Sequence, residues 1–207
     1  MPSRNILKAD VPNSYYHIYF RGNDRAKIFR DAKDFEKMLQ LFARYLSLAE
    51  VKNAAGVSYP NYYHKLELSA FCLMPNQAHL LVHQRQQGAM TAFMRSLLTG
   101  YSMYFNKRYK RRGPLFESRY RASLISDDSY LEHVARYIHL QPKQWRDYEY
   151  SSLPYYLQQI TDEWIVPRHT SSTLRSAEEY VLFMADSKQH KEMLDILKHE
   201  LADEAKS

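Results

Sequence analysis

The feature that most constrains the fold of this chain is the way the spacing of its apolar residues changes along the sequence. In residues 15–21 (YYHIYFR), His17, Tyr19 and Arg21 alternate with more apolar side chains, which is the spacing of a strand. From Asp31 to about Leu48 the apolar residues recur every three or four positions, as on one face of a helix. The chain is therefore predicted to begin with a strand followed by a helix.

The same two spacings continue through the middle of the sequence. Segments 66–74 and 77–83 have strand character, and Pro75-Asn76 between them predicts a hairpin. Helical spacing returns from Met90 to Phe105, and residues 115–125 (LFESRYRASLI) again indicate a strand. The order strand, helix, strand, strand, helix, strand is that of an α+β protein with a ferredoxin-like split βαβ fold and a central antiparallel sheet.

Further helices are expected after these six elements. Residues 126–128 offer capping side chains for a third helix, which Pro142 should end. Apolar residues in 177–200 predict one or two closing helices. We therefore expect one domain over residues 1–155, with a C-terminal helical extension over 156–207 packed on the same domain.

The sequence gives no indication of secretion or of membrane insertion. No window approaches the roughly 20 apolar residues of a membrane helix, and no basic start is followed by a long apolar run. The single cysteine, Cys72, excludes an intramolecular disulfide and lies in an apolar strand pattern, which predicts a buried, inert thiol. We expect a soluble, cytoplasmic protein.

Positive charge is concentrated in one part of the chain. The net charge is +6, and nine basic residues against one acid, Glu117, lie between Arg85 and Arg121. Tyrosines interleaved with them suit stacking on unpaired bases beside phosphate-neutralising side chains. A solvated helix end with core tyrosines explains this feature equally well. The candidate DNA-contacting residues are Arg95, Arg108, Lys110, Arg111, Arg112, Arg119 and Arg121, of which the last two share one face of the expected fourth strand.

A polar face is expected on the third strand. In LMPNQAHLLVH, residues 73–83, the alternation places Gln77, His79 and His83 on one side of the sheet. Residues two apart on a strand lie roughly 6–7 Å from each other, so Gln77 and His79 can share one metal ion. His83 is about 13 Å from His79 along the strand, which excludes it from the same ion.

The third helix carries a second pair of polar residues. Tyr137 and Gln141 are spaced i,i+4 and share a helix face. That face differs from the apolar stripe that should enter the core, which consists of Leu131, Val134, Ala135 and Ile138. Because the residue before a proline is pushed out of helical geometry, the direction of Gln141 stays open at this point.

Four segments in order carry a family resemblance: YYHIYFRGNDRAKIF, CLMPNQAHLLV, GPLFESRYRASLI and VARYIHLQP. Together they resemble REP-associated tyrosine transposases, members of the single-tyrosine HUH transposase family, over about residues 11–155. The resemblance implies a metal-dependent enzyme that cuts and rejoins single-stranded DNA, often next to a hairpin. It implies no nucleotide cofactor, because a phosphodiester is exchanged rather than hydrolysed.

The resemblance also implies roles for particular residues. Family enzymes place two histidines, separated by one hydrophobic residue, on a central strand. The following helix carries a nucleophilic tyrosine, with an Asn or Gln four residues later as the third metal ligand. Carried onto this chain, His79 is the second histidine, Tyr137 the nucleophile that forms a 5′-phosphotyrosine, and Gln141 the amide ligand. The ion would be Mg2+ or Mn2+.

Gln77 occupies the position of the first histidine. A glutamine oxygen can bind a hard cation such as Mg2+ or Mn2+, although a neutral amide should bind Mn2+ more weakly than an imidazole does. Three explanations stay open: a natural tolerated ligand, a lineage that has lost cleavage while keeping DNA binding, or an engineered substitution.

The leading hypothesis is a single-strand DNA transesterase acting near REP-like hairpins. The rival is a catalytically weakened or inactive relative that binds DNA hairpins without cutting them. A third hypothesis is an RNA-binding ferredoxin-like module. For the leading reading we expect a nucleoid-associated monomer or homodimer whose partner is single-stranded DNA with hairpins.

Overall fold

A four-stranded antiparallel sheet forms the centre of the molecule. The computed structural model describes residues 10–167, 176–197 and 201. The strands lie in the order β2-β3-β1-β4, which is the strand order of the ferredoxin-like fold. They are β1 (Ser14–Arg21), β2 (Leu66–Met74), β3 (Gln77–Gln84) and β4 (Arg121–Leu124). The predicted fold class is confirmed.

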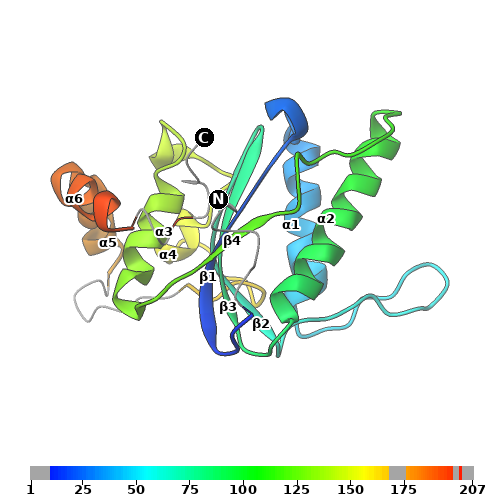
Figure 1. Ribbon diagram of the computed structural model, residues 1–207, viewed down its shortest axis with the longest axis horizontal. Coiled ribbons are helices and arrows are strands. Elements are labelled where there is room, and N and C mark those ends of the chain that lie inside the picture. The colour runs from blue at the N-terminus through cyan, green and yellow to red at the C-terminus, as the bar shows by residue number, and fades with distance from the viewer. Residues whose placement is uncertain (1–9, 168–175, 198–200, 202–207) are drawn as a thin grey trace, which may run out of the picture.

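Helices lie on both sides of this sheet (Figure 1). One face is covered by α1 (Ala32–Leu46) and α2 (Ala89–Arg108), which are separated in sequence by the β2-β3 hairpin. On the other side lie α3 (Leu131–His139), α4 (Leu153–Tyr156), α5 (Ala177–Ala185) and α6 (Ser187–Leu197). Within the described part of the chain, no helix is both long and apolar enough to cross a membrane.

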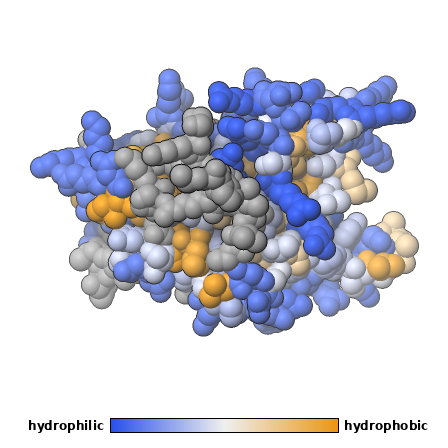
Figure 2. All heavy atoms as spheres, viewed as in Figure 1, coloured by the Kyte–Doolittle hydropathy of each residue, from blue (hydrophilic) through white to orange (hydrophobic). Residues whose placement is uncertain are grey.

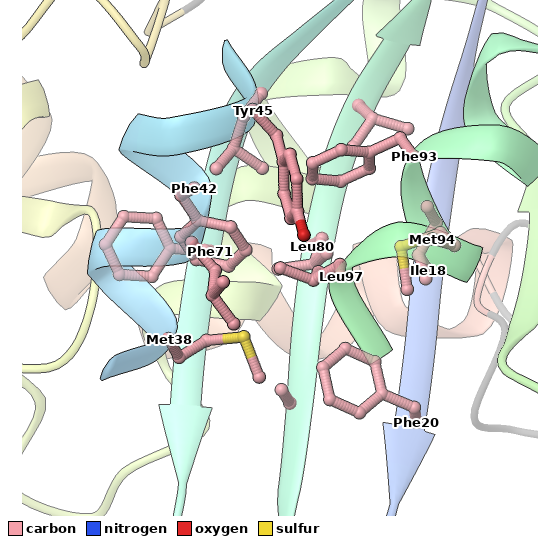
Figure 3. Packing of buried hydrophobic residues seen from close by; sticks show 14 of the residues in the cluster. Ile18, Phe20, Met38, Phe42, Tyr45, Phe71, Leu80, Phe93, Met94 and Leu97 are labelled. Carbon is pink, nitrogen blue, oxygen red and sulfur yellow. The ribbon is translucent and has the colours of Figure 1, made fainter. Parts of the chain in front are cut away.

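The larger core fills the space between the sheet and the α1-α2 pair (Figure 3). The strands contribute alternate residues, among them Ile18 and Leu80, and the helices contribute large side chains such as Phe42 and Phe93. All four are fully buried. The period-two alternation in the strands and the three-to-four spacing in the helices therefore meet in one apolar layer, as the sequence predicts.

A second apolar cluster lies on the opposite face, between the sheet and α3. It contains all four residues of the predicted α3 stripe, which are buried. Cys72 also lies here with no exposed surface, and burial raises the pKa of its thiol, as expected for an inert cysteine. Because α3 buries this stripe against the sheet, the adjacent face of α3, which carries Tyr137, lies beside the strands.

The start of the fourth strand differs from the prediction. β4 begins only at Arg121, so Arg119 lies outside the strand and does not share a strand face with it. Before Arg121 the chain meets the end of β1 through an isolated bridge between Gly22 and Phe116 and a hydrogen bond from the Glu117 N–H to the Arg21 carbonyl, and residues 117–119 are exposed. The third helix ends at His139, shortly before Pro142, as expected if this proline ends it.

Candidate functional site

Polar and aromatic side chains gather where the β1-β3 pair faces α3. His17 and Tyr19 come from β1, His79 from β3 and Tyr137 from α3. Tyr19 is the antiparallel partner of His79, and His17 lies two pairs further along the ladder, opposite Leu81. The Tyr137 ring lies edge-on to both imidazoles, with centroids 5.9 Å from His79 and 5.8 Å from His17. The structure therefore brings Tyr137 and His79 together.

Hydrogen bonds connect the β1 and β3 members of this group. The Tyr19 hydroxyl donates to Gln77 Oε1 at 3.3 Å. Gln77 Nε2 lies 3.4 Å from His79 Nε2 and 3.5 Å from Met74 Sδ. His79 Nδ1 is 3.2 Å from Nε2 of His17, and both histidines have no exposed surface. Both ring nitrogens of His79 therefore have polar neighbours within the protein.

Buried contacts behind α3 hold the orientation that turns Tyr137 toward the sheet. His139 contacts the Tyr180 hydroxyl through Nδ1 at 2.9 Å and Ser152 Oγ through Nε2 at 2.7 Å. The buried Arg136 guanidinium donates to the Asp186 carbonyl and to the Gln189 side chain. Because these groups anchor the helix on the side of α5 and α6, the partly buried Tyr137 side chain lies over β1 and β3.

Gln141 lies just beyond this helix. It follows the C-cap residue Leu140, and its backbone N–H donates to the Ile138 carbonyl at 3.4 Å. Its side-chain Nε2 donates to the Tyr137 carbonyl at 3.3 Å. The amide nitrogen of Gln141 is therefore hydrogen-bonded to the last turn of α3. The amide oxygen is the atom of this side chain that can bind a metal ion.

The donor atoms present define which metal ion the site suits. Among the described residues, no group of three or more His, Cys, Asp or Glu side chains is placed to hold an ion. The ligand set that the resemblance predicts, His79 Nε2 with the amide oxygens of Gln77 and Gln141, suits a hard ion of the Mg2+ or Mn2+ class in donor type. The contact found for the Gln141 side chain is to the Tyr137 carbonyl. Gln77 presents its nitrogen to His79, so ligation by Gln77 requires its amide to turn over and to give up the Tyr19 hydroxyl.

His83 belongs to a separate cluster. Its Nδ1 lies 3.0 Å from Glu67 Oε2, and its ring stacks on Tyr15 with centroids 4.4 Å apart. Arg85 also pairs with Glu67. His83 therefore belongs to a hydrogen-bonded cluster around Glu67, apart from the group that contains His79.

The basic residues at the end of α2 have two kinds of surroundings. Arg108 donates to Asp31 at 2.6 Å and to Asp34 at 2.7 Å, joining α2 to the start of α1. Arg111 donates to Asn106 and to the Pro114 carbonyl, which braces the turn after α2. Lys110 and Arg112 are exposed, and hydrophilic residues cover the upper right of the molecule, where α2 ends (Figure 2). Arg108 and Arg111 thus have intramolecular partners, whereas the other two face solvent.

The remaining candidate DNA-contacting residues lie nearer to β4. Arg95 and Arg119 are both exposed. Burial raises the pKa of the Tyr120 hydroxyl, and the positive charges of these two arginines partly offset that rise, so both lie near Tyr120. The pKa of the Glu117 carboxyl is held below its usual value chiefly by a hydrogen bond from Arg21, and the charge of Arg121 lowers it further. These arginines therefore form a positive region along the segment that leads into β4.

An open hollow of about 350 Å³ adjoins the site and is lined by Arg21, Asp24, Arg25 and Glu117. Arg21 pairs with Gln77 across the β1-β3 ladder, so the hollow begins next to the polar group. Sequence reasoning selected neither Arg21 nor His17 as site residues. The alternation in 15–21 places both on the polar face of β1, but the register that brings that face beside Gln77 and His79 comes from strand pairing.

One family model matches the part of the chain that holds these candidate residues. Residues 63–141, which include Gln77, His79, Tyr137 and Gln141, match the family model described as Transposase IS200 like. No curated protein matches the chain. The match confirms the predicted resemblance and supports a role in DNA transposition.

Solved structures share the fold at low sequence identity. The structure of a REP-associated tyrosine transposase bound to a REP hairpin matches with a TM-score of 0.55 and 11% identity, over 81% of this chain and 94% of that chain. A putative transposase from Deinococcus radiodurans R1 gives a TM-score of 0.38 and 19% identity, over 65% of this chain and 95% of that one. Of these two, only the first is similar enough to support the assignment of the fold.

Proposed function

We propose that this protein is an enzyme that cleaves and rejoins single-stranded DNA next to hairpins. The proposal starts from the match of residues 63–141 to the IS200-like transposase family. Tyr137 is the nucleophile and forms a 5′-phosphotyrosine. The observation that carries this proposal is the position of the Tyr137 ring beside His79, with centroids 5.9 Å apart, on the polar face of β1 and β3. Both His79 and Tyr137 lie within the part of the chain that matches the family.

The reaction exchanges one phosphate ester for another. Tyr137 Oη attacks the scissile phosphorus and loses its proton as the new O–P bond forms. The bond from phosphorus to the 3′ oxygen breaks, and that oxygen takes up a proton and leaves as a 3′-hydroxyl. Because the ester is retained, attack by a 3′-hydroxyl on the phosphotyrosine rejoins the strand and regenerates the tyrosine.

A tyrosine hydroxyl has an ordinary pKa of about 10, so it is a weak nucleophile at neutral pH without assistance. A Mg2+ or Mn2+ ion held by His79 Nε2, Gln77 and Gln141 would polarise the scissile phosphate and stabilise charge on the leaving oxygen. The protein's own contribution is to hold the phenol and the imidazole on one polar face, where a single phosphate can reach both groups.

The DNA backbone would follow the positive region next to this site. Arg25 in the hollow, with Arg95, Arg119 and Arg121, would contact phosphates near the scissile bond, whereas Arg21 is already paired with Glu117. Lys110 and Arg112 extend the positive surface at the end of α2. Arg108 and Arg111 are proposed to contribute less, because their guanidinium groups already have intramolecular partners.

Gln77 favours a second candidate function, a hairpin-binding protein that does not cut. In this structure an amide nitrogen, not an oxygen ligand, faces His79 Nε2. If that arrangement persists with DNA bound, ion binding at His79 is weakened and the fold retains only its DNA-binding surface.

The test uses a pool of single-stranded oligonucleotides that carry a stem-loop with randomised flanks, incubated with the protein and Mn2+. A label on the 3′ side of the scissile bond should become covalently attached to the protein, and a label on the 5′ side should be released with a free 3′-hydroxyl. Tyr137→Phe should abolish the covalent band. Tyr130→Phe, a matched change on the short turn before α3, should keep it.

The other outcomes separate the candidates. Hairpin binding without a covalent band supports the non-cutting function, and activity gained in Gln77→His would identify position 77 as the cause. A band that survives Tyr137→Phe contradicts the proposed nucleophile. Tight RNA binding indifferent to Mn2+ and to Tyr137→Phe, with no binding of DNA hairpins, contradicts both candidates.

A further inference from the structure

A second buried histidine supports His79 from the neighbouring strand. His17 Nε2 and His79 Nδ1 are 3.2 Å apart, the ring centroids are 5.4 Å apart, and the ring planes differ by 10°. The centroid separation exceeds the nitrogen separation by about the two ring radii, so the imidazoles meet end to end in nearly one plane. This is the geometry of a hydrogen bond between ring nitrogens rather than of face-to-face stacking.

Such a bond requires one nitrogen to donate and the other to accept. Neither ring has exposed surface, and burial disfavours the charged form of both. With both rings neutral, the proton lies either on His79 Nδ1 or on His17 Nε2. The first arrangement leaves a lone pair on His79 Nε2, and the second places a proton there.

The surroundings of Gln77 decide between these two arrangements. Its Oε1 accepts from the Tyr19 hydroxyl, and its Nε2 lies near the Met74 sulfur, which is a weak acceptor. Turned over, the amide could accept from a protonated His79 Nε2 and donate to the Tyr19 hydroxyl, but its carbonyl oxygen would then face the lone pairs of that sulfur, a contact that the observed orientation avoids. The amide nitrogen therefore donates to His79 Nε2, so Nε2 carries the lone pair and Nδ1 carries the proton.

We propose that His17 is a positioning residue, which accepts the Nδ1 proton of His79 and thereby holds the His79 Nε2 lone pair toward Gln77 and the nucleophile. The inference rests on the proposed function for its consequence, because Nε2 is the nitrogen that would bind the metal ion. It deepens that function by assigning a support for the one histidine that the metal site retains. Partners of this kind fix both the tautomer and the ring orientation of a ligating histidine.

The tautomer is measurable in the wild-type protein without DNA or metal. Long-range proton-nitrogen correlation spectra of 15N-histidine-labelled protein, at about pH 8 and so above the ordinary histidine pKa of about 6.5, distinguish the two neutral forms. The His79 signals are identified by their loss in His79→Gln. We expect the proton on Nδ1, and a His79 spectrum with the proton on Nε2 would overturn the proposal.

Two variants at position 17 separate positioning from packing. His17→Gln keeps an acceptor and should preserve the Nδ1–H form, whereas His17→Phe removes it and should move the proton to Nε2 in part of the population. Titration with MnCl2 alone should show affinity weakened about 10–100-fold in His17→Phe and close to wild type in His17→Gln. The exposed His64→Gln is the matched control and should change neither reading.

Equal tautomers and equal Mn2+ affinities in wild type and His17→Phe would refute the role of His17, whatever the protein does to DNA. Absence of a covalent DNA band in the wild type contradicts the proposed function instead, and the tautomer measurement then decides the role of His17 by itself.

Discussion

Single residues in this molecule carry structural roles that their sequence neighbourhood conceals. Asp34, near the start of α1, is fully buried and accepts hydrogen bonds from Arg108, Tyr104 and Tyr109 at 2.7 to 3.1 Å. Burial, reinforced by this carboxylate, raises the pKa of Tyr109 to about 12. Charges in the basic run at the end of α2 therefore differ in role, because Arg108 compensates a buried acid of the same molecule.

We expect Asp34→Ala to lower the free energy of unfolding by about 3 kcal/mol, because it leaves a cation and two hydroxyls without their shared acceptor. Urea unfolding followed by circular dichroism measures this change. Glu36→Ala, an exposed position on the same helix, is the control and should change stability by less than about 0.5 kcal/mol. Equal effects of the two substitutions would show that the buried network contributes nothing special.

At the scale of elements, the contact between α3 and α6 combines basic groups in partly buried surroundings. The pKa of His133 on α3 is lowered, first by burial and then by Arg136. The pKa of His190 on α6 is lowered by burial, by Arg136 and by His133. Asp186 faces the same cluster and is the acidic group that partly offsets it. Protonation of either histidine therefore opposes the docking of α6 on the helix that carries Tyr137.

The sign of the resulting pH dependence follows from linkage. Because the folded-state pKa values lie below the ordinary value of 6.5, the unfolded chain binds these protons first as the pH falls. Stability from this contact is complete above about pH 6.5 and is lost progressively below it. We expect the fall in unfolding free energy between about pH 7.5 and 5.5 to be smaller in His133→Gln than in wild type. The exposed His64→Gln should keep the wild-type dependence, and a parallel curve for His133→Gln would contradict the assignment.

At the scale of the whole molecule, the sheet has an apolar cluster on each face. The second cluster includes Tyr180 and Met184 from α5 together with Leu81 from β3 and Val134 from α3. Tyr180 is fully buried and its hydroxyl contacts His139, so α5 is joined to the helix that carries the proposed nucleophile. This packing supports the prediction that the C-terminal helices fold on the same domain as residues 1–155.

If they do, Tyr180→Ala should destabilise the whole chain, by about 3 to 5 kcal/mol, in a single transition. Circular dichroism and tryptophan fluorescence should then give the same urea midpoint. Leu182→Ala, at a 71% exposed position of the same helix, should leave the midpoint nearly unchanged. An early partial loss of helix, with the remaining transition at the wild-type midpoint, would show instead that the C-terminal helices unfold separately.

How much of this was predictable differs from element to element. The β2-β3 hairpin and the apolar stripe of α3 were predicted correctly, because local periodicity alone decides which side of a strand or helix is apolar. The early start of the fourth strand was wrong, since Arg21 pairs with Glu117 and the chain before Arg121 stays outside the ladder. His17 was not selected, because a polar residue on a strand face acquires a role only through its neighbour on the next strand.

By itself, the sequence determined the strand and helix order and the apolar faces, because each depends on spacing within one segment. The candidate residues His79 and Tyr137 came from the family resemblance of four segments in order. Only the tertiary structure decided that His17 meets His79, that Gln77 turns its nitrogen toward the same imidazole and that Arg108 serves Asp34. These contacts join residues 2 to 74 positions apart, and their directions depend on strand register, helix rotation and hydrogen-bond complementarity. A one-residue shift in the register of β1 against β3 would leave the spacing of apolar residues in each strand unchanged, but it would separate His17 and Tyr19 from His79 and Gln77.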